Sequence, residues 1–266
     1  KEARRRLVFE ELFLLQSALA LKREEHKKES GIPFSMDRSL TSSFLHCLPY
    51  SLTLSQKKVT REILGDMRSL HPMNRLLQGD VGSGKTVVAT LTLLTAIANG
   101  YQGVLMAPTE ILAQQHWLTL RQLLAPLNIE TALLVSDLPS ADKREIRTGL
   151  KDGRVQLVIG THALIQKEID FSKLGAVVID EQHRFGVMQR LSLRGKGKSP
   201  HVLVMTATPI PRTLALTSYG DLDLSIIDKL PPGRKSVLTR WISRSKREDL
   251  YGFVREELRA GRQAYF

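Results

Sequence analysis

Residues 76–88 read LLQGDVGSGKTVV, and this stretch decides the fold of the chain. A short apolar run leads into the pattern G-x-x-x-x-G-K-T, and a mostly apolar stretch then continues to Ala98. This order predicts a strand, a phosphate-binding loop and a helix. The glycines let the backbone curl, so that successive N–H groups can converge on phosphate oxygens. The alternative is a Gly/Ser loop that binds nothing. The strand before it, the helix after it and the terminal Lys-Thr together argue against that alternative.

The residues of this loop are the first candidates for a nucleotide site. Lys85 can reach the β- and γ-phosphates, and Thr86 can ligate Mg²⁺ at the positive end of the following helix. The candidate phosphate-binding residues are Gly79, Asp80, Val81, Gly82, Ser83, Gly84, Lys85 and Thr86.

The composition indicates a globular protein with an anionic partner. The 266 residues carry a formal net charge of +12, which favours a polyanion such as nucleic acid. Cys47 is the only cysteine, so there is no intrachain disulfide, and we expect it to be a buried thiol in a reducing compartment. No apolar run approaches the roughly 18–20 residues of a membrane span. The basic start of the chain lacks the apolar core of a signal peptide, so we expect a cytoplasmic protein.

The rest of the chain alternates between strands and helices. We expect one long helix over residues 2–29, a loop over 34–54, and a further helix with Ser55 as its N-cap. Apolar strands are predicted at residues 103–107, 131–135, 155–159, 176–179, 201–205 and 224–228, with helices at 110–124, 140–151 and 245–260. Near-continuous apolar strands joined by helices predict an α/β fold, with a mostly parallel sheet buried on both faces.

Two further groups of polar residues follow predicted strands. Asp180 and Glu181 come at the carboxyl end of an apolar strand, where open α/β sheets place their ligands. Asp180 suits the Mg²⁺ that also touches Thr86, and Glu181 suits the base that polarises an attacking water. Thr206 and Thr208 end the next strand and could relay the nucleotide state, although two such threonines are also typical of a helix cap.

These motifs together carry a family resemblance. Residues 79–86, 180–183 and 206–208 resemble the first three core motifs of superfamily 2 helicases. The longer stretches 73–86, 180–187, 205–217, 219–223 and 230–234 are similar to the RecG family of bacterial branch-migrating DNA helicases, and the resemblance covers essentially the whole chain. Transcription–repair coupling translocases share residues 206–212 but usually carry Asp-Glu-Glu-His where this chain has Gln182, which makes them the alternative.

The resemblance implies the fold and the reaction. The fold would be a RecA-like P-loop NTPase domain preceded by a long helix, and the reaction would be ATP hydrolysis with Mg²⁺, driving movement on branched or forked DNA. Residues 1–33 would be a strut from an N-terminal wedge domain, 34–235 the first motor domain and 236–266 the start of the second. The chain would then be a fragment of a monomeric, cytoplasmic, bacterial helicase, and would hydrolyse ATP weakly or not at all by itself.

The resemblance also implies roles for particular residues. Gln56 and Tyr50 match the segment that recognises adenine; without the family, Gln56 would be a first-turn helix residue. Gln182 and His183 would couple the γ-phosphate site to the threonine motif, and Arg212 would contact DNA or the other domain. The residues that match DNA-backbone motifs are Thr109, Glu110, Thr161 and His162; taken alone, they would be helix caps.

Two other classes of protein remain as alternatives. A P-loop kinase would transfer phosphate to a small molecule, but the Asp-Glu-Gln-His run and the basic charge argue against it. A non-catalytic nucleic-acid-binding module would use ATP only as a switch. ATP consumption with and without branched DNA distinguishes the two enzymes, because a kinase should ignore the DNA. Glu181→Gln in the full-length protein tests the binding module, because a pure binder should keep all its activity.

Overall fold

The computed structural model describes residues 1–35, 39–166, 168–180, 197, 199–208, 222–229 and 238–265, without the side chains of residues 15, 19, 22, 23 and 25–28. The chain divides into two compact units, residues 1–231 and 232–266. The first unit contains the sheet, and the second contains α9 (Arg247–Arg259) preceded by the 3₁₀ turn η4 (Arg244–Lys246).

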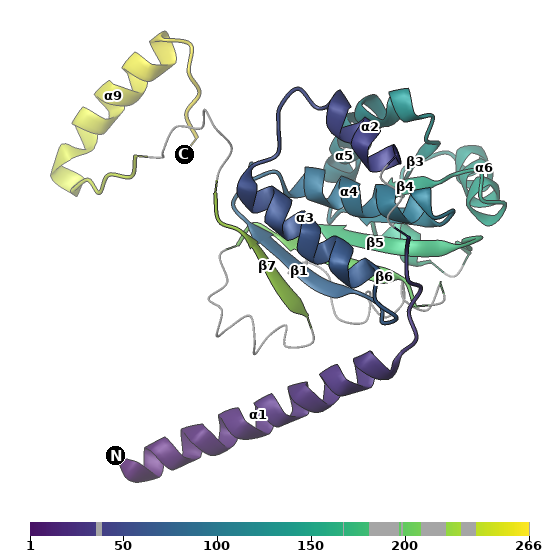
Figure 1. The fold of residues 1–266 in the computed structure, drawn as a ribbon. Helices are drawn as coiled ribbons and strands as arrows, with labels where there is room; N and C mark the ends of the chain where they lie inside the picture. Colours follow the sequence, from purple (N-terminus) through teal and green to yellow (C-terminus); the bar gives the residue numbers. More distant parts are fainter. Residues whose placement is uncertain are drawn as a thin grey trace. The chain divides into compact units, whose positions relative to one another are not determined.

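The first unit is built on a seven-stranded sheet in which all six strand pairings are parallel, in the order β3-β4-β2-β5-β6-β1-β7 (Figure 1). The strands are β1 (Asn74–Gly79), β2 (Gln102–Met106), β3 (Thr131–Leu134), β4 (Leu157–Gly160), β5 (Leu174–Asp180), β6 (His201–Thr206) and β7 (Asp223–Ile227). The predicted parallel α/β sheet is therefore confirmed.

The helices of the first unit agree with the sequence expectation, apart from α2, which was not expected. They are α1 (Glu2–Lys28), α2 (Ser39–Cys47), α3 (Leu54–Met67), α4 (Lys85–Ala98), α5 (Glu110–Leu124) and α6 (Ser140–Lys151), with 3₁₀ turns η1 (Ala125–Leu127) and η2 (His162–Ile165). None of the described helices is both long and apolar enough to cross a membrane.

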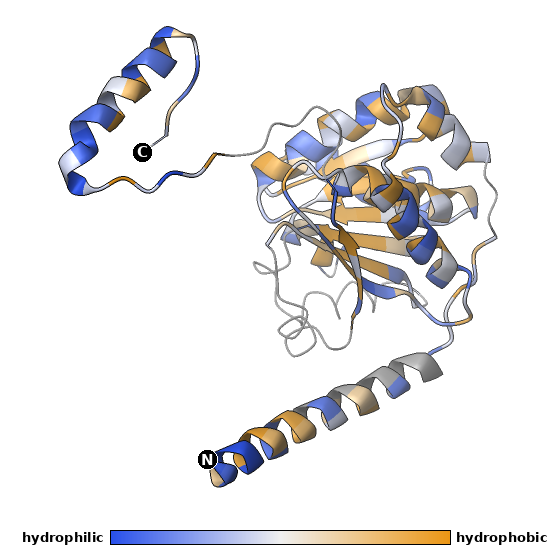
Figure 2. Ribbon diagram, turned by 60° about the vertical axis from the view of Figure 1, so that its left-hand side comes forward, coloured by the Kyte–Doolittle hydropathy of each residue, from blue (hydrophilic) through white to orange (hydrophobic). Residues whose placement is uncertain are grey.

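Both faces of the sheet are buried. Successive side chains of a strand point to opposite faces, so each strand contributes to two core clusters. Leu105 belongs to the cluster under α4, whereas its neighbours Val104 and Met106 belong to the cluster on the other face. The first cluster includes residues of α2, α3, α4 and α5, and the second includes residues of α6 and η2. Figure 2 shows the apolar strands between more polar helices.

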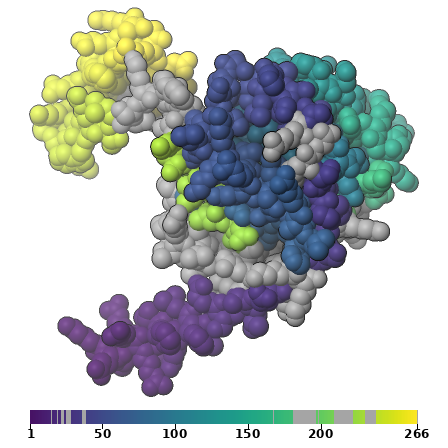
Figure 3. Space-filling model, viewed as in Figure 1, coloured from purple at the N-terminus to yellow at the C-terminus, as the bar shows by residue number. Residues whose placement is uncertain are grey.

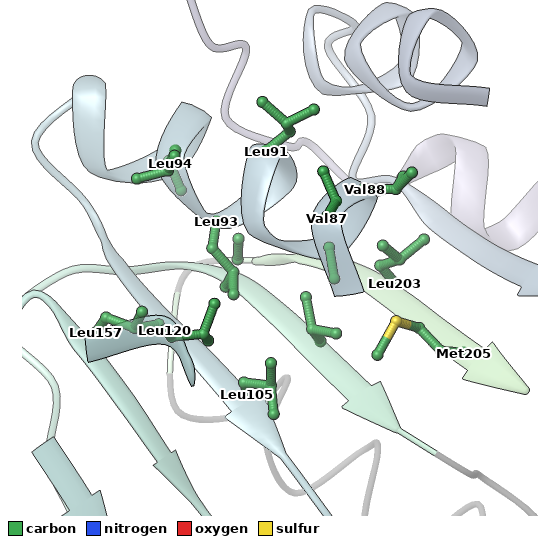
Figure 4. Packing of buried hydrophobic residues seen from close by; sticks show 14 of the residues in the cluster. Val87, Val88, Leu91, Leu93, Leu94, Leu105, Leu120, Leu157, Leu203 and Met205 are labelled. Carbon is green, nitrogen blue, oxygen red and sulfur yellow. The ribbon is translucent and has the colours of Figure 1, made fainter. Parts of the chain in front are cut away.

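Among the described helices, α4 has the longest run of buried residues. Every residue from 87 to 97 is buried, and Figure 4 shows Val87, Leu91 and Leu94 on this helix above Leu203 and Met205 of the sheet. Burial of a leucine side chain stabilises a fold by about 1.5–3 kcal/mol. This packing holds the start of α4, and the loop before it, against the sheet.

Three local expectations were wrong. The predicted loop over residues 34–54 contains α2, because Phe44 is fully buried and Leu40 packs against the same core cluster. Cys47, expected to be buried, is exposed. Ser55 does not cap α3; Thr53 does, and its hydroxyl accepts a hydrogen bond from the Gln56 N–H while the Gln56 side chain accepts one from the Thr53 N–H. This is a capping box.

Candidate nucleotide site

Three groups of predicted site residues lie at the carboxyl edge of the sheet. Strand β6 lies between β1 and β5, so the ends of these three strands are neighbours. Gln78 pairs with Thr206, and Asp180 pairs with Met205. The phosphate-binding loop, the threonine motif and the first acidic residue are therefore brought to one edge, as the sequence predicted.

The loop after β1 has the backbone of an anion site. Gly82 and Gly84 have φ angles of +75° and +86°, a region that side-chain-bearing residues avoid. Gly84 is also the N-cap of α4, and no side chain caps this helix. The first N–H groups of a helix have no partner within the helix, so a phosphate group can accept their hydrogen bonds.

Lys85 lies folded over the same loop. Its ammonium donates hydrogen bonds to the carbonyl oxygens of Gly79 at 2.7 Å and Asp80 at 3.1 Å. The Asp80 carboxylate in turn accepts a hydrogen bond from the Val81 N–H at 2.7 Å. The hydroxyl of Ser83 is buried and has no hydrogen-bond partner in the described part of the chain. The loop thus gathers a cation and a buried hydroxyl at the start of α4.

Gln56 braces the loop from α3. Its side-chain amide donates a hydrogen bond to the Ser83 carbonyl at 2.7 Å, and only 2% of the residue is exposed. A Cβ atom built on Gly84 would lie 2.2 Å from this amide nitrogen. Tyr50, by contrast, is 52% exposed and lines a cavity of about 830 Å³ between α2, α3 and α4, to which Gln56 does not contribute. Helices α2 and α3 lie on the face that Figure 3 shows. Adenine recognition by this pair stays a prediction.

Asp180 is fixed by a histidine that the sequence did not single out. The Nε2 atom of His116, on α5, lies 2.9 Å from Oδ2 of Asp180, and the two side chains are 15% and 13% exposed. The hydrogen bond tethers the carboxylate to a helix that begins 70 residues earlier in the chain.

The donor atoms fit Mg²⁺. Asp180 supplies a carboxylate and Thr86 a hydroxyl, both hard oxygen donors of the kind that Mg²⁺ prefers. The described residues contain no group of three or more His, Cys, Asp or Glu that could hold a metal ion. Mg²⁺ at nucleotide sites does not require such a group, because it commonly binds through one or two carboxylates, substrate phosphates and water. Glu181, Gln182, His183 and Arg212, assigned from the sequence, lie outside the described residues.

The residues predicted to contact DNA follow β2 and β4. Thr109 is the N-cap of α5, and its hydroxyl accepts a hydrogen bond from the Leu112 N–H at 3.3 Å. Glu110 accepts one from the Ser136 N–H at 2.8 Å. The Thr161 hydroxyl, in contrast, is buried without a partner among the described residues, and His162 beside it is exposed. A role of these residues in DNA binding stays a prediction.

The threonine motif forms a compact turn at the end of β6. Thr206 is 2% exposed, and its hydroxyl lies 2.8 Å from the Thr208 hydroxyl. The Thr208 N–H also donates to the Thr206 oxygen at 3.2 Å. The turn therefore has a defined shape next to the phosphate-binding loop.

Sequence reasoning missed the roles of three residues at this edge. Thr53 sets the position of Gln56, and Ser55 donates a hydrogen bond to the Asp228 carboxylate at 2.7 Å, which ties the start of α3 to the end of β7. His116 holds Asp180. The one available signal was that His116 falls on the buried side of α5, three residues after Ala113 and four before Leu120.

Comparison with known proteins is consistent with this geometry. The model of the DEAD/DEAH box helicase family matches residues 53–217. The chain is 50% identical to the ATP-dependent DNA helicase RecG of Aquifex aeolicus over 98% of its length, and 48% identical to RecG of Bacillus subtilis over its whole length. It spans 33% and 39% of these two relatives.

Solved structures give the same result. A structure of RecG bound to a three-way DNA junction superposes with a TM-score of 0.87 and 47% identity, covering 97% of this chain and 35% of that one. The DUF1998 helicase MrfA bound to DNA has a TM-score of 0.62 at 20% identity, which shows a shared fold only. The family model covers more than half of the chain, and the RecG resemblance seen in the sequence extends over its full length. The chain therefore belongs to the DEAD/DEAH box helicase family.

Proposed function

We propose that this chain is the ATP-binding motor part of a RecG-type DNA helicase that remodels branched DNA. The observation that carries the proposal is the juxtaposition of the phosphate-binding loop, Asp180 and Thr206 on three adjacent strands. Near 50% identity to RecG along the whole chain supports the same assignment. The net charge of +12 suits a DNA backbone.

The proposed reaction is attack of water on the γ-phosphate of ATP. The ammonium of Lys85 neutralises developing charge on the phosphates, and Thr86 and Asp180 hold the Mg²⁺ that supplies further charge neutralisation when bound. Glu181 orients the attacking water, and Gln182 and His183 couple the γ-phosphate to the threonine motif. In this proposal Tyr50 and Gln56 recognise adenine.

The proposed organisation places this motor inside a longer protein. Residues 1–33 form a helix that links to a DNA-binding wedge, residues 34–235 form the first motor domain, and residues 236–266 begin the second. The chain spans about a third of its RecG relatives. By itself it binds nucleotide, turns it over weakly and does not unwind DNA. The full-length protein is a cytoplasmic bacterial monomer.

The test is ATP hydrolysis by the full-length protein that contains this chain, on forked, single-stranded and plain duplex DNA. We expect the forked DNA to stimulate turnover most, into the ordinary enzyme range of about 1–10³ s⁻¹. Glu181→Gln should lower turnover about 10²–10⁴-fold, the usual contribution of a general base, and leave nucleotide binding intact. Glu168→Gln, which removes an exposed carboxylate, is the matched control and should change neither.

Two results would contradict the proposal. Turnover that ignores DNA would indicate phosphate transfer to another acceptor. Full DNA remodelling by Glu181→Gln would indicate a module for which ATP is only a switch.

A further inference from the structure

The hydrogen bond between His116 and Asp180 joins two regions that are 64 residues apart in the chain. Asp180 ends β5 and is the carboxylate that the site offers to Mg²⁺. His116 lies in the middle of α5, outside every motif discussed above. The contact therefore brings a hydrogen-bond donor from another element to the carboxylate of the candidate metal site.

The position of His116 is set by the packing of its helix. Ala113 and Leu120 are fully buried against the sheet, and His116 lies three residues after the first and four before the second. Residues at these spacings share one face of a helix. The ring is therefore held on the sheet side of α5, with its Nε2 atom 2.9 Å from the Asp180 carboxylate.

Both ends of the contact are rigid. The start of α5 is fixed by the Thr109 cap and by the hydrogen bond from the Ser136 N–H to Glu110. Asp180 continues a strand whose preceding residues are all buried, and its neighbour Ile179 pairs with Met106 of β2, the strand that leads into α5. The histidine and the carboxylate are thus positioned by one connected piece of structure.

We propose that His116 is a positioning residue for the metal ligand Asp180. The carboxylate accepts a hydrogen bond from the Nε2–H group at Oδ2, and this bond selects one side-chain rotamer of Asp180. A metal-ligating carboxylate gains affinity when such a partner fixes its orientation, and loss of the partner typically costs about 10–100-fold in metal affinity. The proposal rests on the proposed function, because it requires a nucleotide-associated divalent cation at Asp180.

Three substitutions separate the hydrogen bond from the shape of the side chain. His116→Ala removes the donor. His116→Gln places an amide nitrogen near the position of Nε2, and His116→Asn places it near Nδ1, too short to reach Asp180. Gln and Asn differ by one methylene and carry the same donor, so each is the matched control of the other.

The measurement is the affinity for Mn²⁺, followed by the electron paramagnetic resonance signal of the free ion, in the full-length protein with a non-hydrolysable ATP analogue. We expect His116→Ala and His116→Asn to weaken Mn²⁺ binding about 10–100-fold. His116→Gln should stay within about threefold of the wild type because it restores the donor. Affinity for the analogue in excess chelator should be the same in all four proteins.

The outcomes distinguish this proposal from the function on which it rests. If the wild-type protein binds no Mn²⁺ with the analogue, the proposed nucleotide site is wrong and the inference is wrong with it. If the wild type binds Mn²⁺ and His116→Ala binds it equally well, only the inference is overturned. An equal loss in the Ala, Gln and Asn variants would also overturn it, because the shape of the ring and not its hydrogen bond would then be responsible.

Discussion

The two edges of the same parallel sheet use polar side chains in opposite ways. At the amino edge, Gln102 begins β2, and its amide donates to the Leu150 and Val155 carbonyls at 2.8 Å while accepting from the Lys173 N–H at 3.0 Å. At the carboxyl edge, the hydroxyls of Ser83 and Thr161 are buried and have no partner in the described part of the chain.

His201, at the start of β6, is also fully hydrogen-bonded within the fold. Its Nδ1 atom accepts a hydrogen bond from the Met73 N–H at 3.0 Å, and its Nε2–H donates to the Ile32 carbonyl at 2.8 Å. The ring also packs against Phe34, with 4.8 Å between ring centroids. The polar atoms of Gln102 and His201 at the amino edge are thus satisfied within the fold and contribute stability. At the carboxyl edge, the hydroxyls of Ser83 and Thr161 have no partner among the described residues and can serve ligands.

The largest effect is expected from Gly84→Ala at the carboxyl edge. The φ of +86° disfavours a side chain, and the added Cβ would lie 2.2 Å from the Gln56 amide nitrogen. We expect loss of detectable nucleotide binding, measured with a fluorescent ATP analogue. Gly100→Ala is the matched control: its φ is +76°, and nothing lies within 4 Å of the added atom. It should cost about 1–2 kcal/mol of stability from backbone strain and leave nucleotide affinity unchanged.

A nucleotide affinity that survives Gly84→Ala would show that the Gln56 side chain or the loop can shift without loss of the anion site. The difference between the two edges would then be smaller than the geometry indicates. If Gly84→Ala and Gly100→Ala lowered nucleotide affinity equally, backbone strain at positive φ, and not the contact with Gln56, would explain the loss.

The next effect concerns His201→Ala at the amino edge. It leaves the Met73 N–H and the Ile32 carbonyl without partners, at about 1–3 kcal/mol for each group if it stays buried. We expect a lower melting temperature with unchanged nucleotide affinity in the folded protein. His162→Ala, which truncates an exposed histidine, should leave the melting temperature unchanged. A loss of nucleotide affinity in His201→Ala would mean that the two edges are not independent.

The same residue predicts a pH dependence. Burial is the largest cause that lowers the pKa of His201 below its ordinary value of 6.5. Below about pH 6.5 the unfolded chain therefore binds a proton that the folded chain excludes, so this contribution to stability is complete above that pH and decreases as pH falls. The melting temperature of the wild type should decrease more steeply than that of His201→Ala between pH 7 and pH 5.

The contrast between the edges also explains what the sequence could predict. The strands and α4 were predictable because runs such as residues 176–179 are apolar enough to be buried on both faces of a sheet. The loop of residues 79–86 was predictable because this spacing of glycines with Lys85 is typical of phosphate binding. Helix α2 was missed because it has only nine residues, in which Phe44 is the one fully buried side chain and Leu40 packs beside the core, so its apolar pattern is too short to recognise.

Contacts between distant segments were the main feature that the sequence could not predict. The spacing from Ala113 and Leu120 places His116 on the buried side of α5, but it does not identify the partner, because Asp180 is brought close only by the pairing of β2 with β5. Ser55 was predicted as a helix cap because its residue type suits that position; it instead bonds Asp228, 173 residues away. Residue type indicated that these side chains needed a partner, but only the topology could identify it.

The smallest effect separates two threonines of the carboxyl edge. Thr109→Val removes an N-cap and should cost about 0.5–2 kcal/mol of stability. Thr161→Val replaces a buried hydroxyl that has no partner among the described residues, so stability should stay the same or rise slightly. If the Thr161 hydroxyl binds a DNA phosphate, the same substitution should weaken DNA binding about 2–10-fold, the equivalent of one hydrogen bond. Fluorescence anisotropy with a labelled fork and thermal unfolding measure the two quantities in the same samples.

Valine has nearly the shape of threonine, so each variant isolates one hydroxyl. Thr161→Val with lower stability and unchanged DNA affinity would place Thr161 with the internally satisfied groups of the amino edge, and the distinction between the edges would fail at that position. Weaker DNA binding at unchanged stability would make Thr161 the clearest case of a polar group kept for a ligand, because nothing in the described fold depends on its hydroxyl. Thr109 cannot give so clean a result, since its oxygen is already committed to the first turn of α5.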